Sequence, residues 1–455
     1  MKNLILDTDS YKMSHFLGYP EGTTEMYSYL ESRGGKYSKI PFIGLQPILK
    51  KLEQGVDIDD VDEALEFSEK HGLPFNYQGW KDIVYEHNGK LPVEIRALPE
   101  GSVVPSGIPM LTIRNTDHKH AWLTSYLETL LLRVWYPMTV AARINVMKNN
   151  IKPYFEMTSD EGEVSPFAIL DFSSRGVSSR EQSEVGGLGY LVHFLGSDNV
   201  PAVDFVNKLY HSDMSGFSVP ATEHSIMCAF GEESEKQSFE YLVENMGQEG
   251  GILSVVSDTW DIFRATDTWM DLAEKIKEKN LTLVIRPDSG DIEEVLPAIL
   301  DKALESWPYY HINTKGYVVF DNLKILWGDG INEETGFLPF AIAKHRGISA
   351  DSIMTGSGGG LMQANIDRDT CKLAIKGSNV IVNGESRPIS KSPVTDKGKR
   401  SKEGKFSVFR HSDGSWDWSN DLKHDANELR LVFKNGYSYS EYTIDNVRER
   451  IKNQG

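Results

Sequence analysis

Short apolar runs that each end in a polar turn recur through the middle of the chain. Three of these runs are followed by a segment in which apolar residues recur at helical spacing: Trp260–Lys279, Ile292–Trp307 and Asn332–His345. Strand, polar turn and helix in series form the unit of an α/β barrel, which carries its chemistry at the carboxyl ends of its strands. The six runs are Phe167–Gly176, Phe217–His224, Ile252–Asp258, Thr282–Asp291, Leu323–Gly330 and Ser352–Gly360.

The run Thr282–Asp291 shows the unit most clearly. Its β-favouring residues predict a buried strand, Pro287 ends that strand, and Gly290 permits a tight turn. Arg286 and Asp288 are therefore expected at a fixed position at the strand mouth. Six such turns in series predict the rim of a single site.

Both ends of the chain have a different pattern. Apolar alternation and turn residues predict strands at Met26–Arg33, Leu91–Gly101, Pro109–Arg114, Asn379–Gly384, Phe406–Arg410 and Leu429–Phe433, with a short one at Leu4–Leu6. Helical spacing is present over Ile43–Leu52, Val61–His71, Ala121–Trp135 and Thr139–Phe155. We therefore expect an α/β barrel at 161–378 and a second, β-rich domain built from both termini. Residues 1–160 would supply the first part of that domain together with helices, and 379–455 would complete it.

Composition and charge narrow the class of protein. A chain of 455 residues exceeds the size at which one core usually stops growing, about 250–300 residues. The net charge of −18 argues against a nucleic-acid partner, because phosphate contacts need a basic surface. Two cysteines cannot form a disulfide framework, and no apolar run approaches the roughly 20 residues that span a bilayer. The N-terminus lacks a signal-peptide pattern, so a cytoplasmic protein without a membrane partner is expected.

Seven motifs in order along the chain resemble those of the nicotinamide phosphoribosyltransferase family. They are Asp9–Lys12, Asp171–Ser179, Ser218–Ser225, Ser254–Asp258, Ile285–Gly290, Gly328–Gly330 and Gly356–Gly360. The resemblance implies a homodimer with the type II phosphoribosyltransferase fold, which is built on an irregular α/β barrel, and active sites shared across the interface. It also implies transfer of phosphoribosyl from phosphoribosyl diphosphate to nicotinamide, giving nicotinamide mononucleotide and diphosphate in NAD salvage.

The resemblance assigns a slot for the flat base. Phe172 and the partner subunit's Tyr11 would sandwich the pyridine ring, and Asp198 would accept from the carboxamide while repelling a nicotinate carboxylate. Arg286 and Ser254 would complete this slot. From the residues alone, the rings also fit ordinary core packing, and Asp198 also fits a helix N-cap before Val200–Leu209.

Phosphate and ribose contacts follow from the same resemblance. Arg175, Gly358, Gly359, Arg368 and Lys376 match phosphate-binding positions, and Arg33, His224, Lys391 and Lys399 match the diphosphate side. Asp288, Gly328 and Asp329 would hold the ribose. The alternatives are strand-end salt bridges for the arginines, a plain turn for the glycines, and a solvated charge run for the loop at 396–405.

His224 is the expected catalytic residue, together with Asp288 and Asp258. The resemblance implies that ATP, as co-substrate, phosphorylates this histidine, and a neutral imidazole is nucleophilic near pH 7. Mg²⁺ is expected to arrive with the diphosphate, and its protein ligands are unknown from the sequence. A capping or core histidine is the alternative for His224.

Three other functions compete with this one. Nicotinate phosphoribosyltransferase differs in the base, and Asp198 would discriminate between the two. An aldolase-like or isomerase-like barrel would need a lysine or an acid–base pair at a strand end, and the six turns contain no lysine at the mouth. A non-enzymatic signalling or scaffold protein on the same fold would be indifferent to the loss of His224.

Overall fold

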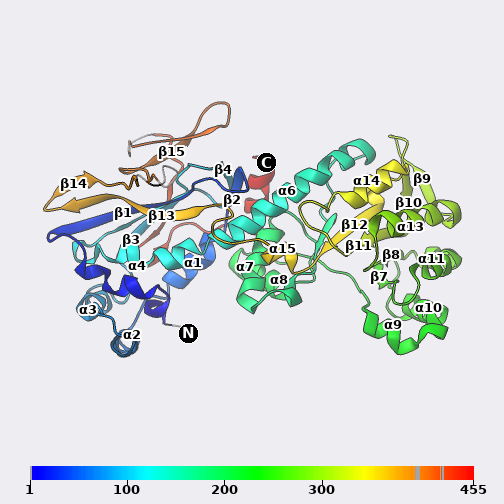
Figure 1. Cartoon of the computed structure of the whole chain (residues 1–455), viewed down its shortest axis with the longest axis horizontal. Helices are drawn as coiled ribbons and strands as arrows, with labels where there is room; N and C mark the ends of the chain where they lie inside the picture. Colours follow the sequence, from blue (N-terminus) through cyan, green and yellow to red (C-terminus); the bar gives the residue numbers. More distant parts are fainter. Residues whose placement is uncertain (1–2, 394, 396–399, 421, 423–424, 455) are drawn as a thin grey trace. The chain divides into compact units, whose positions relative to one another are not determined.

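The computed structural model describes residues 3–393, 395, 400–420, 422 and 425–454 (Figure 1). The chain divides into two compact units. Unit 1 comprises Met1–Ala142, Lys208–Ser212 and Asn365–Gly455, and unit 2 comprises Arg143–Asn207 and Asp213–Ala364. The folding domains predicted at 1–160, 161–378 and 379–455 stay a prediction.

Unit 1 is organised by a seven-stranded antiparallel sheet in the order β14-β13-β1-β5-β3-β17-β18. These strands are β1 Thr23–Ser32, β3 Val93–Ala97, β5 Leu111–Asn115, β13 Leu373–Val382, β14 Glu385–Pro388, β17 Arg430–Lys434 and β18 Tyr437–Ser438. Strands from both ends of the chain thus share one sheet, as the sequence predicted. The β13–β14 turn has positive φ at Asn383 (53°) and Gly384 (81°), which is the hairpin geometry that Asn-Gly favours.

Smaller elements complete unit 1. Two short pairs of strands are β2 Lys39–Phe42 with β4 Ser102–Pro105, and β15 Ser407–Arg410 with β16 Trp416–Ser419. The helices are η1 Leu4–Leu6, η2 Ser10–Leu17, α1 Leu45–Leu52, α2 Ile58–His71, α3 Tyr77–Glu86, η3 His118–His120, α4 Leu123–Tyr126, α5 Glu128–Leu132 and α16 Ile444–Lys452. The strand predicted at Leu4–Leu6 is wrong, because the Asn3 side chain accepts from the Ile5 N–H (2.9 Å) and starts a 3-10 turn.

The helical region before residue 160 breaks earlier than predicted. Helix α6 runs over Trp135–Thr158, so Pro137 lies inside its first turn, where the missing N–H of proline is not needed. The helix predicted at Ala121–Trp135 is instead divided into α4 and α5, and the break before α6 follows α5. Among the helices that the structure describes, none is both long enough and apolar enough to cross a membrane.

Unit 2 contains a parallel sheet of five strands in the order β6-β12-β11-β8-β7. The strands are β6 Ile169–Asp171, β7 Ile252–Val256, β8 Thr282–Arg286, β11 Leu323–Trp327 and β12 Ile353–Ser357. Their interiors are buried, as is typical of parallel strands covered on both faces. The surrounding helices are η4 Ser174–Gly176, α7 Arg180–Leu191, α8 Val200–Leu209, α9 His224–Phe230, η5 Glu232–Ser234, α10 Glu235–Asn245, α11 Ile262–Asp271, α12 Ala273–Glu278, α13 Ile292–Ser306, α14 Leu338–His345, η6 Ala350–Ser352 and α15 Gly360–Gln363.

The ring of strands closes irregularly. Isolated parallel bridges join Asp171 to Ser197, Gly196 to Phe217, and Ala221 to Ser254, so the segment 217–221 links the two edges of the sheet. Five of the six predicted strands are confirmed. The sixth, Phe217–His224, forms only these bridges, because Pro220 interrupts it and cannot donate to a ladder. The irregular α/β barrel with additional β-rich structure is therefore confirmed.

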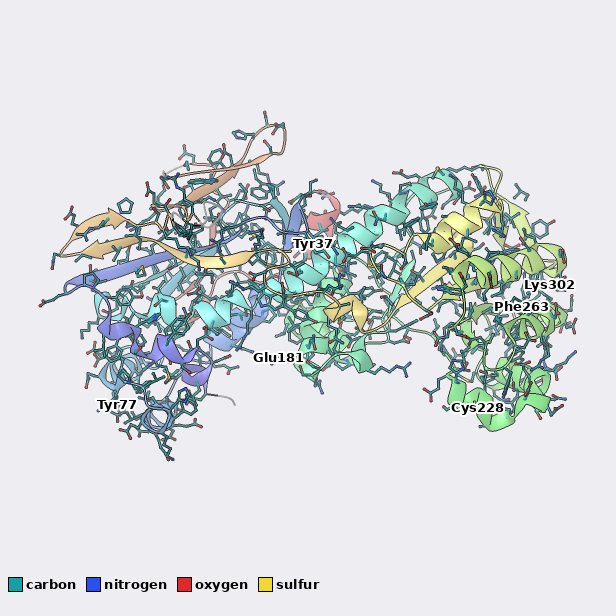
Figure 2. All side chains as sticks on the ribbon, in the orientation of Figure 1. Tyr37, Tyr77, Glu181, Cys228, Phe263 and Lys302 are labelled. Carbon is teal, nitrogen blue, oxygen red and sulfur yellow. The ribbon has the colours of Figure 1, made fainter. Side chains whose placement is uncertain are left out.

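The two cysteines lie in different units and are both free. Cys228, labelled in Figure 2, is exposed on α9, and Cys371 is buried. A hairpin of β9 Tyr310–Ile312 and β10 Val318–Phe320 completes the elements of unit 2.

Candidate active site

A cavity of about 480 Å³ lies inside the barrel of unit 2. Phe172, Asp198 and Arg286 line it at the carboxyl ends of the strands, and Ser254 lines it in the middle of β7. Lys324 lines it from the amino-terminal half of β11. The cavity therefore extends along the strands, and four of the predicted base-binding residues line it.

The position of Phe172 depends on a glycine of the neighbouring strand. The N–H of Phe172 donates to the Ser357 carbonyl (2.9 Å) directly after β6. A Cβ at Gly356 would lie 2.2 Å from a carbon of the Phe172 ring, so only glycine leaves room for the ring there. Phe217 also lines the cavity and adds a second aromatic ring. Tyr11 lies in η2 of unit 1 and is 57% exposed.

Asp198 is held in place through both its backbone and its side chain. Its N–H donates to the Asp171 carbonyl (3.0 Å), and its Oδ1 accepts from the Ser218 hydroxyl (2.6 Å). The N-cap interpretation of Asp198 is wrong, because the Asn199 side chain accepts from the Ala202 N–H (3.1 Å) at the start of α8. The exposed carboxylate of Asp198 is thus available at the cavity.

Behind this loop, Asp171 is fully buried. Its carboxylate accepts from the Ser173 N–H (2.9 Å) and the Ser197 hydroxyl (3.0 Å), which join the end of β6 to the loop that carries Asp198. Burial raises the pKa of Asp171, although these hydrogen bonds oppose the shift. Asp171 therefore holds two walls of the cavity together.

Two polar groups on the cavity wall have no partner among the described residues. They are the buried Arg286 Nε and the buried Ser254 Oγ. Arg286 Nη2 donates to the Thr222 carbonyl (3.1 Å). The partner described for Arg286 is therefore a backbone carbonyl, and not the carboxylate that a strand-end salt bridge would need. Leaving such groups unpaired is costly, which favours a polar ligand at this wall.

The predicted catalytic residues lie together beyond the ends of β7 and β8. His224 Nε2 is 3.8 Å from Asp258 Oδ1 and 3.8 Å from Asp288 Oδ2. Its Nδ1 is 3.1 Å from the Thr259 hydroxyl, which orients the ring. The Asp288 N–H donates to Asp258 Oδ2 (2.9 Å), so the two strand ends are linked directly. The His224 side chain is 47% exposed, whereas that of Asp258 is 4% exposed.

The turn after β11 is shaped to admit Asp288. A Cβ at Gly328 would lie 2.7 Å from Asp288 Oδ1, so a glycine is needed for this approach. The exposed Asp329 follows, and its carbonyl accepts from Trp327 Nε1 (2.7 Å). The three predicted ribose-binding residues are therefore neighbours.

The predicted phosphate loops of unit 2 touch through their backbones. A Cβ at Gly359 would lie 2.7 Å from the carbonyl oxygen of Gly176, next to the exposed Arg175. Gly358 has nothing within 4 Å of its Cβ position. Helix α15 has only four residues, so any anion here would rely on the loop itself and not on a helix dipole.

The predicted phosphate-binding residues of unit 1 form a cationic cluster. Lys376 on β13 faces Glu128, with 3.8 Å between Nζ and Oε1, and Lys12 pairs with the same carboxylate. Burial lowers the pKa of Lys376, Glu128 opposes this, and the charges of Arg33, Lys391 and Lys12 lower it further. Arg33 Nε and Nη1 are buried without a partner among the described residues.

Two predicted phosphate-binding residues are not placed in this cluster. Arg368 is exposed before β13, and its Nη2 donates to Asp369 Oδ1 (2.7 Å). Lys399 lies outside the described residues.

Sequence reasoning left several participants without a role. Lys12, Ser218 and Thr222 stand inside the quoted motifs, so their positions were visible although their contacts were not. Thr259 directly follows a motif and contacts His224. Lys324 lines the cavity but lies near the start of its strand, where its ammonium donates to the Asp351 carbonyl (2.5 Å). It is therefore not a lysine at the strand mouth.

Comparisons with known proteins identify similar chains. Residues 167–437 match the nicotinate phosphoribosyltransferase (NAPRTase) family, and residues 3–95 match the N-terminal domain of nicotinamide phosphoribosyltransferase. The chain is 40% identical to the nicotinamide phosphoribosyltransferase of Xanthomonas campestris pv. campestris, covering 98% of each chain. It is 32% identical to that of Acinetobacter baylyi, covering 98% of this chain and 96% of the relative.

Solved structures show the same fold at low identity. Nicotinate-nucleotide pyrophosphorylase from Pyrococcus furiosus aligns with a TM-score of 0.63 at 16% identity, covering 98% of this chain and 94% of the other. Human nicotinic acid phosphoribosyltransferase aligns with a TM-score of 0.60 at 17% identity, covering 98% and 93%. These alignments confirm the fold class.

Proposed function

The chain belongs to the nicotinamide phosphoribosyltransferase family, and from this premise we propose that it transfers phosphoribosyl from phosphoribosyl diphosphate to nicotinamide in NAD salvage. The products are nicotinamide mononucleotide and diphosphate. One observation carries the proposal: a cavity lined by Phe172, Asp198 and Arg286, whose Nε has no partner among the described residues, lies in the same barrel as the His224–Asp258–Asp288 cluster.

The base would lie in the cavity with its ring against Phe172. An aromatic wall supplies dispersion and lowers the local dielectric. The carboxamide NH₂ would donate to Asp198, whereas a nicotinate carboxylate would face a like charge. Arg286 Nε and Ser254 Oγ, which lack partners among the described residues, would satisfy the remaining polar atoms of the carboxamide.

The pyridine nitrogen would attack the anomeric carbon of the ribose as the bond to diphosphate breaks. This displacement develops positive charge on the sugar ring, as in glycoside chemistry. Asp288, close to Gly328, would stabilise that charge and hold ribose hydroxyls together with Asp329. The leaving diphosphate takes the electron pair of the broken bond, and no proton needs to move.

The phosphate groups would be bound by cations and loop amides. Arg175 and the Gly358–Gly359 loop serve in unit 2, and Arg33, Lys376 and Lys391 serve in unit 1, where Lys12 joins them. Charge-assisted hydrogen bonds to phosphate are about twice as strong as neutral ones. Arg368 and Lys399 complete the proposed set. In the proposed homodimer, Tyr11 enters the partner's base slot, and Arg368 and Lys376 act across the interface.

His224 would accept a phosphoryl group from ATP. Its exposed ring, its hydrogen bond to Thr259 and its two neighbouring carboxylates support this role. The neutral imidazole supplies the electron pair, and ADP leaves. Asp258 and Asp288 lie close enough to His224 to stabilise a positive charge on its ring.

Mg²⁺ would enter with the diphosphate. Asp258 Oδ1 is buried and accepts no hydrogen bond from the described residues, which fits a hard cation. Asp258 and Asp288 are therefore the carboxylates that would hold it. The ion would neutralise the charge that builds up on the leaving diphosphate.

The base preference tests this function. With phosphoribosyl diphosphate and Mg²⁺, kcat/KM is expected to be far higher for nicotinamide than for nicotinate. Asp198→Ser is expected to narrow the ratio, because the charge that repels nicotinate is gone. Asp213→Ser, on another exposed carboxylate of unit 2, serves as the matched control. Equal use of both bases by the wild type would refute the assignment.

The same assay tests the histidine. ATP is expected to stimulate the wild type and not His224→Ala. A non-enzymatic scaffold protein would form no nicotinamide mononucleotide, whether as the wild type or as His224→Ala.

A further inference from the structure

Three ionisable side chains of unit 1 are not used by the proposed function. His87, Asp117 and His120 each offer one ligand atom, and these atoms all lie within 4.8 Å of one another. His87 is the C-cap of α3, Asp117 is the N-cap of η3, and His120 is the last residue of η3. The group therefore joins the end of one helix to the connection that follows β5.

His120 brings a buried lone pair to this group. Its side chain is 0% exposed, and its Nε2 lies 3.2 Å from the Gly79 carbonyl oxygen. A carbonyl oxygen only accepts, so Nε2 carries the hydrogen and Nδ1 carries the lone pair. Nδ1 has no hydrogen-bond partner among the described residues, and Asp117 Oδ2 is 3.6 Å away, too far for a hydrogen bond. A cation between these two atoms would satisfy both.

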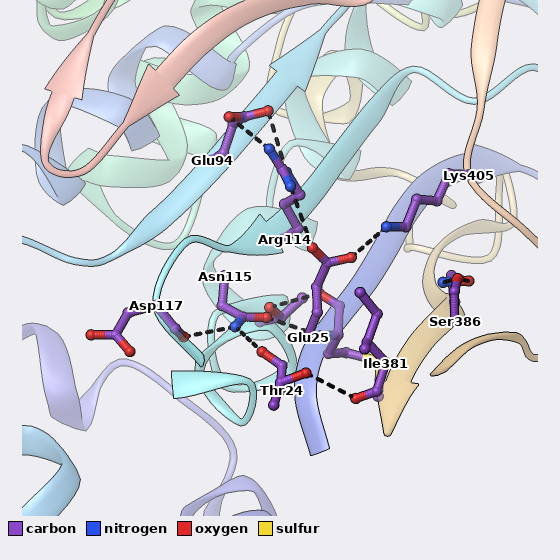
Figure 3. A network of polar contacts seen from close by, with 12 residues as sticks. Thr24, Glu25, Glu94, Arg114, Asn115, Asp117, Ile381, Ser386 and Lys405 are labelled. Atoms are coloured by element: carbon purple, nitrogen blue, oxygen red, sulfur yellow. Dashed lines mark hydrogen bonds and ion pairs between the residues drawn. The ribbon is translucent and has the colours of Figure 1, made fainter. Parts of the chain in front are cut away.

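Asp117 is held so that one carboxylate oxygen faces both rings. Its Oδ1 accepts from the Lys119 N–H (2.9 Å), and its carbonyl accepts from Asn115 Nδ2 (2.8 Å). Asn115 also donates to the Thr24 carbonyl (2.9 Å), which ties this turn to β1 (Figure 3). Oδ2 remains for the group and lies 2.8 Å from His87 Nε2.

We propose that His87 Nε2, Asp117 Oδ2 and His120 Nδ1 form a binding site for a zinc-type divalent cation. Two imidazoles and a carboxylate are a common zinc ligand set, with water in the fourth position. Bonds of about 2.0–2.1 Å at tetrahedral angles separate ligand atoms by about 3.3 Å. The observed 2.8 Å and 3.6 Å lie on either side of this value, and the third pair of ligand atoms lies within 4.8 Å, so side-chain rotations would complete the geometry. As the ion binds, the neutral His87 ring exchanges its hydrogen through solvent from Nε2 to Nδ1, so that Nε2 offers a lone pair and the ring keeps one N–H.

The surroundings of the group suit such an ion. The hydrogen bond from His120 Nε2 to a backbone carbonyl is the support that metal-bound histidines usually have. His87 and Asp117 are each 25% exposed, which gives the ion and its water a way in. On the inner side, the Trp122 ring centroid lies 6.2 Å from that of His120, and Trp80 packs on Trp122. The ion would brace α3 against the turn after β5.

Zinc titration of tag-free, chelator-treated protein tests the site. A chromophoric competitor measures Zn²⁺ affinity, and Co²⁺ absorption reports the ligand geometry. His87→Gln and Asp117→Asn each remove a ligand, and Asn at 117 still offers an oxygen to cap η3. His118→Gln, on the exposed histidine of the same turn, is the matched control.

We expect the wild type and His118→Gln to bind one tight Zn²⁺ per chain and to gain thermal stability from it. His87→Gln and Asp117→Asn should lose this tightly bound Zn²⁺. Losing a contact that only supports a metal ligand lowers affinity by roughly 10- to 100-fold, and losing a ligand itself should lower it further. Equal zinc affinity in all four chains would overturn the proposal, as would the absence of tight binding by the wild type. The readout does not depend on turnover, so it stands apart from the proposed function.

Discussion

The polar sites of the two compact units carry opposite charge. In unit 2, His224 lies 3.8 Å from each of two carboxylates, Asp258 and Asp288. In unit 1, Lys12 and Lys376 share the single carboxylate of Glu128. Carboxylates favour positive charge developing on a ribose, whereas clustered cations favour phosphate. On the proposed reaction, the first site would govern turnover and the second would govern the affinity for phosphoribosyl diphosphate.

The sites also differ from the saturated ion pairs elsewhere in unit 1. Arg114 donates to Glu94 and Glu25, and Lys405 donates to Glu25 as well (Figure 3). In the cationic cluster, by contrast, Arg33 Nε and Nη1 have no partner among the described residues. Unsatisfied buried donors are what distinguish a candidate ligand site from a structural network.

The largest effect is expected from Asp288→Asn. On the proposed mechanism Asp288 carries the charge that stabilises the oxocarbenium, so its removal should lower kcat by about 10²- to 10³-fold, the usual cost of losing one preorganised electrostatic contact. KM for phosphoribosyl diphosphate should change little. Asp291→Asn is the control, because Asp291 only caps α13 through the Glu293 N–H and asparagine caps equally well. A rise in KM for phosphoribosyl diphosphate with kcat unchanged would reverse the roles given to the two units.

Lys376→Met should have the converse effect. Losing a hydrogen bond to a charged phosphate costs about 1.5–3 kcal/mol, so KM for phosphoribosyl diphosphate should rise by about 10- to 100-fold. Steady-state kinetics of Lys376→Met and of Lys39→Met, on an exposed lysine of β2, measure this. An unchanged KM would remove Lys376 from the phosphate site.

These two sites were not equally predictable from the sequence. Asp258 and Asp288 follow the apolar runs of β7 and β8, where a local pattern fixes the position of a side chain. His224 ends the run Phe217–His224, which forms only isolated bridges. The cationic cluster depends on the pairing of β1 with β13, which sets Tyr29 opposite Lys376 across most of the chain. No local signal gives that register, and none gives the contact between Lys12 on η2 and Glu128 on α5.

The errors in the predicted elements have local causes. The apolar residues Leu4–Leu6 resembled a strand, but a side-chain contact from Asn3 favours a 3-10 turn. The run at Phe217–His224 resembled a full strand, but Pro220 limits it to isolated bridges. Asp198 resembled a helix cap, yet its neighbour Asn199 takes that position.

A smaller effect is expected from Gly356→Ala. The added Cβ would lie 2.2 Å from the Phe172 ring and push it out of place, so KM for nicotinamide should rise by about 3- to 10-fold, the value of an aromatic contact. Gly18→Ala is the control, since its Cβ would approach nothing closer than 3.5 Å. Unchanged nicotinamide binding would mean that Phe172 is not a wall of the base slot.

The smallest effect concerns stability and pH. Because burial lowers the pKa of Lys376 below its ordinary 10.5, the charged lysine destabilises the folded protein. This penalty is fully present below the folded-state pKa and is relieved as pH rises from there towards 10.5. Lys376→Met should therefore be at least as stable as the wild type at neutral pH, and its advantage should shrink at alkaline pH. Thermal unfolding across this range measures it, and an advantage that grows with pH would contradict the burial argument.

One competition assay tests the central claim most directly. Nicotinamide and nicotinate are supplied together at equal concentration with phosphoribosyl diphosphate, Mg²⁺ and ATP, and mass spectrometry identifies the mononucleotide formed. The account predicts that the amide mononucleotide strongly predominates, because Asp198 faces the base slot with a negative charge. Equal amounts of both mononucleotides, or no mononucleotide at all, would contradict it.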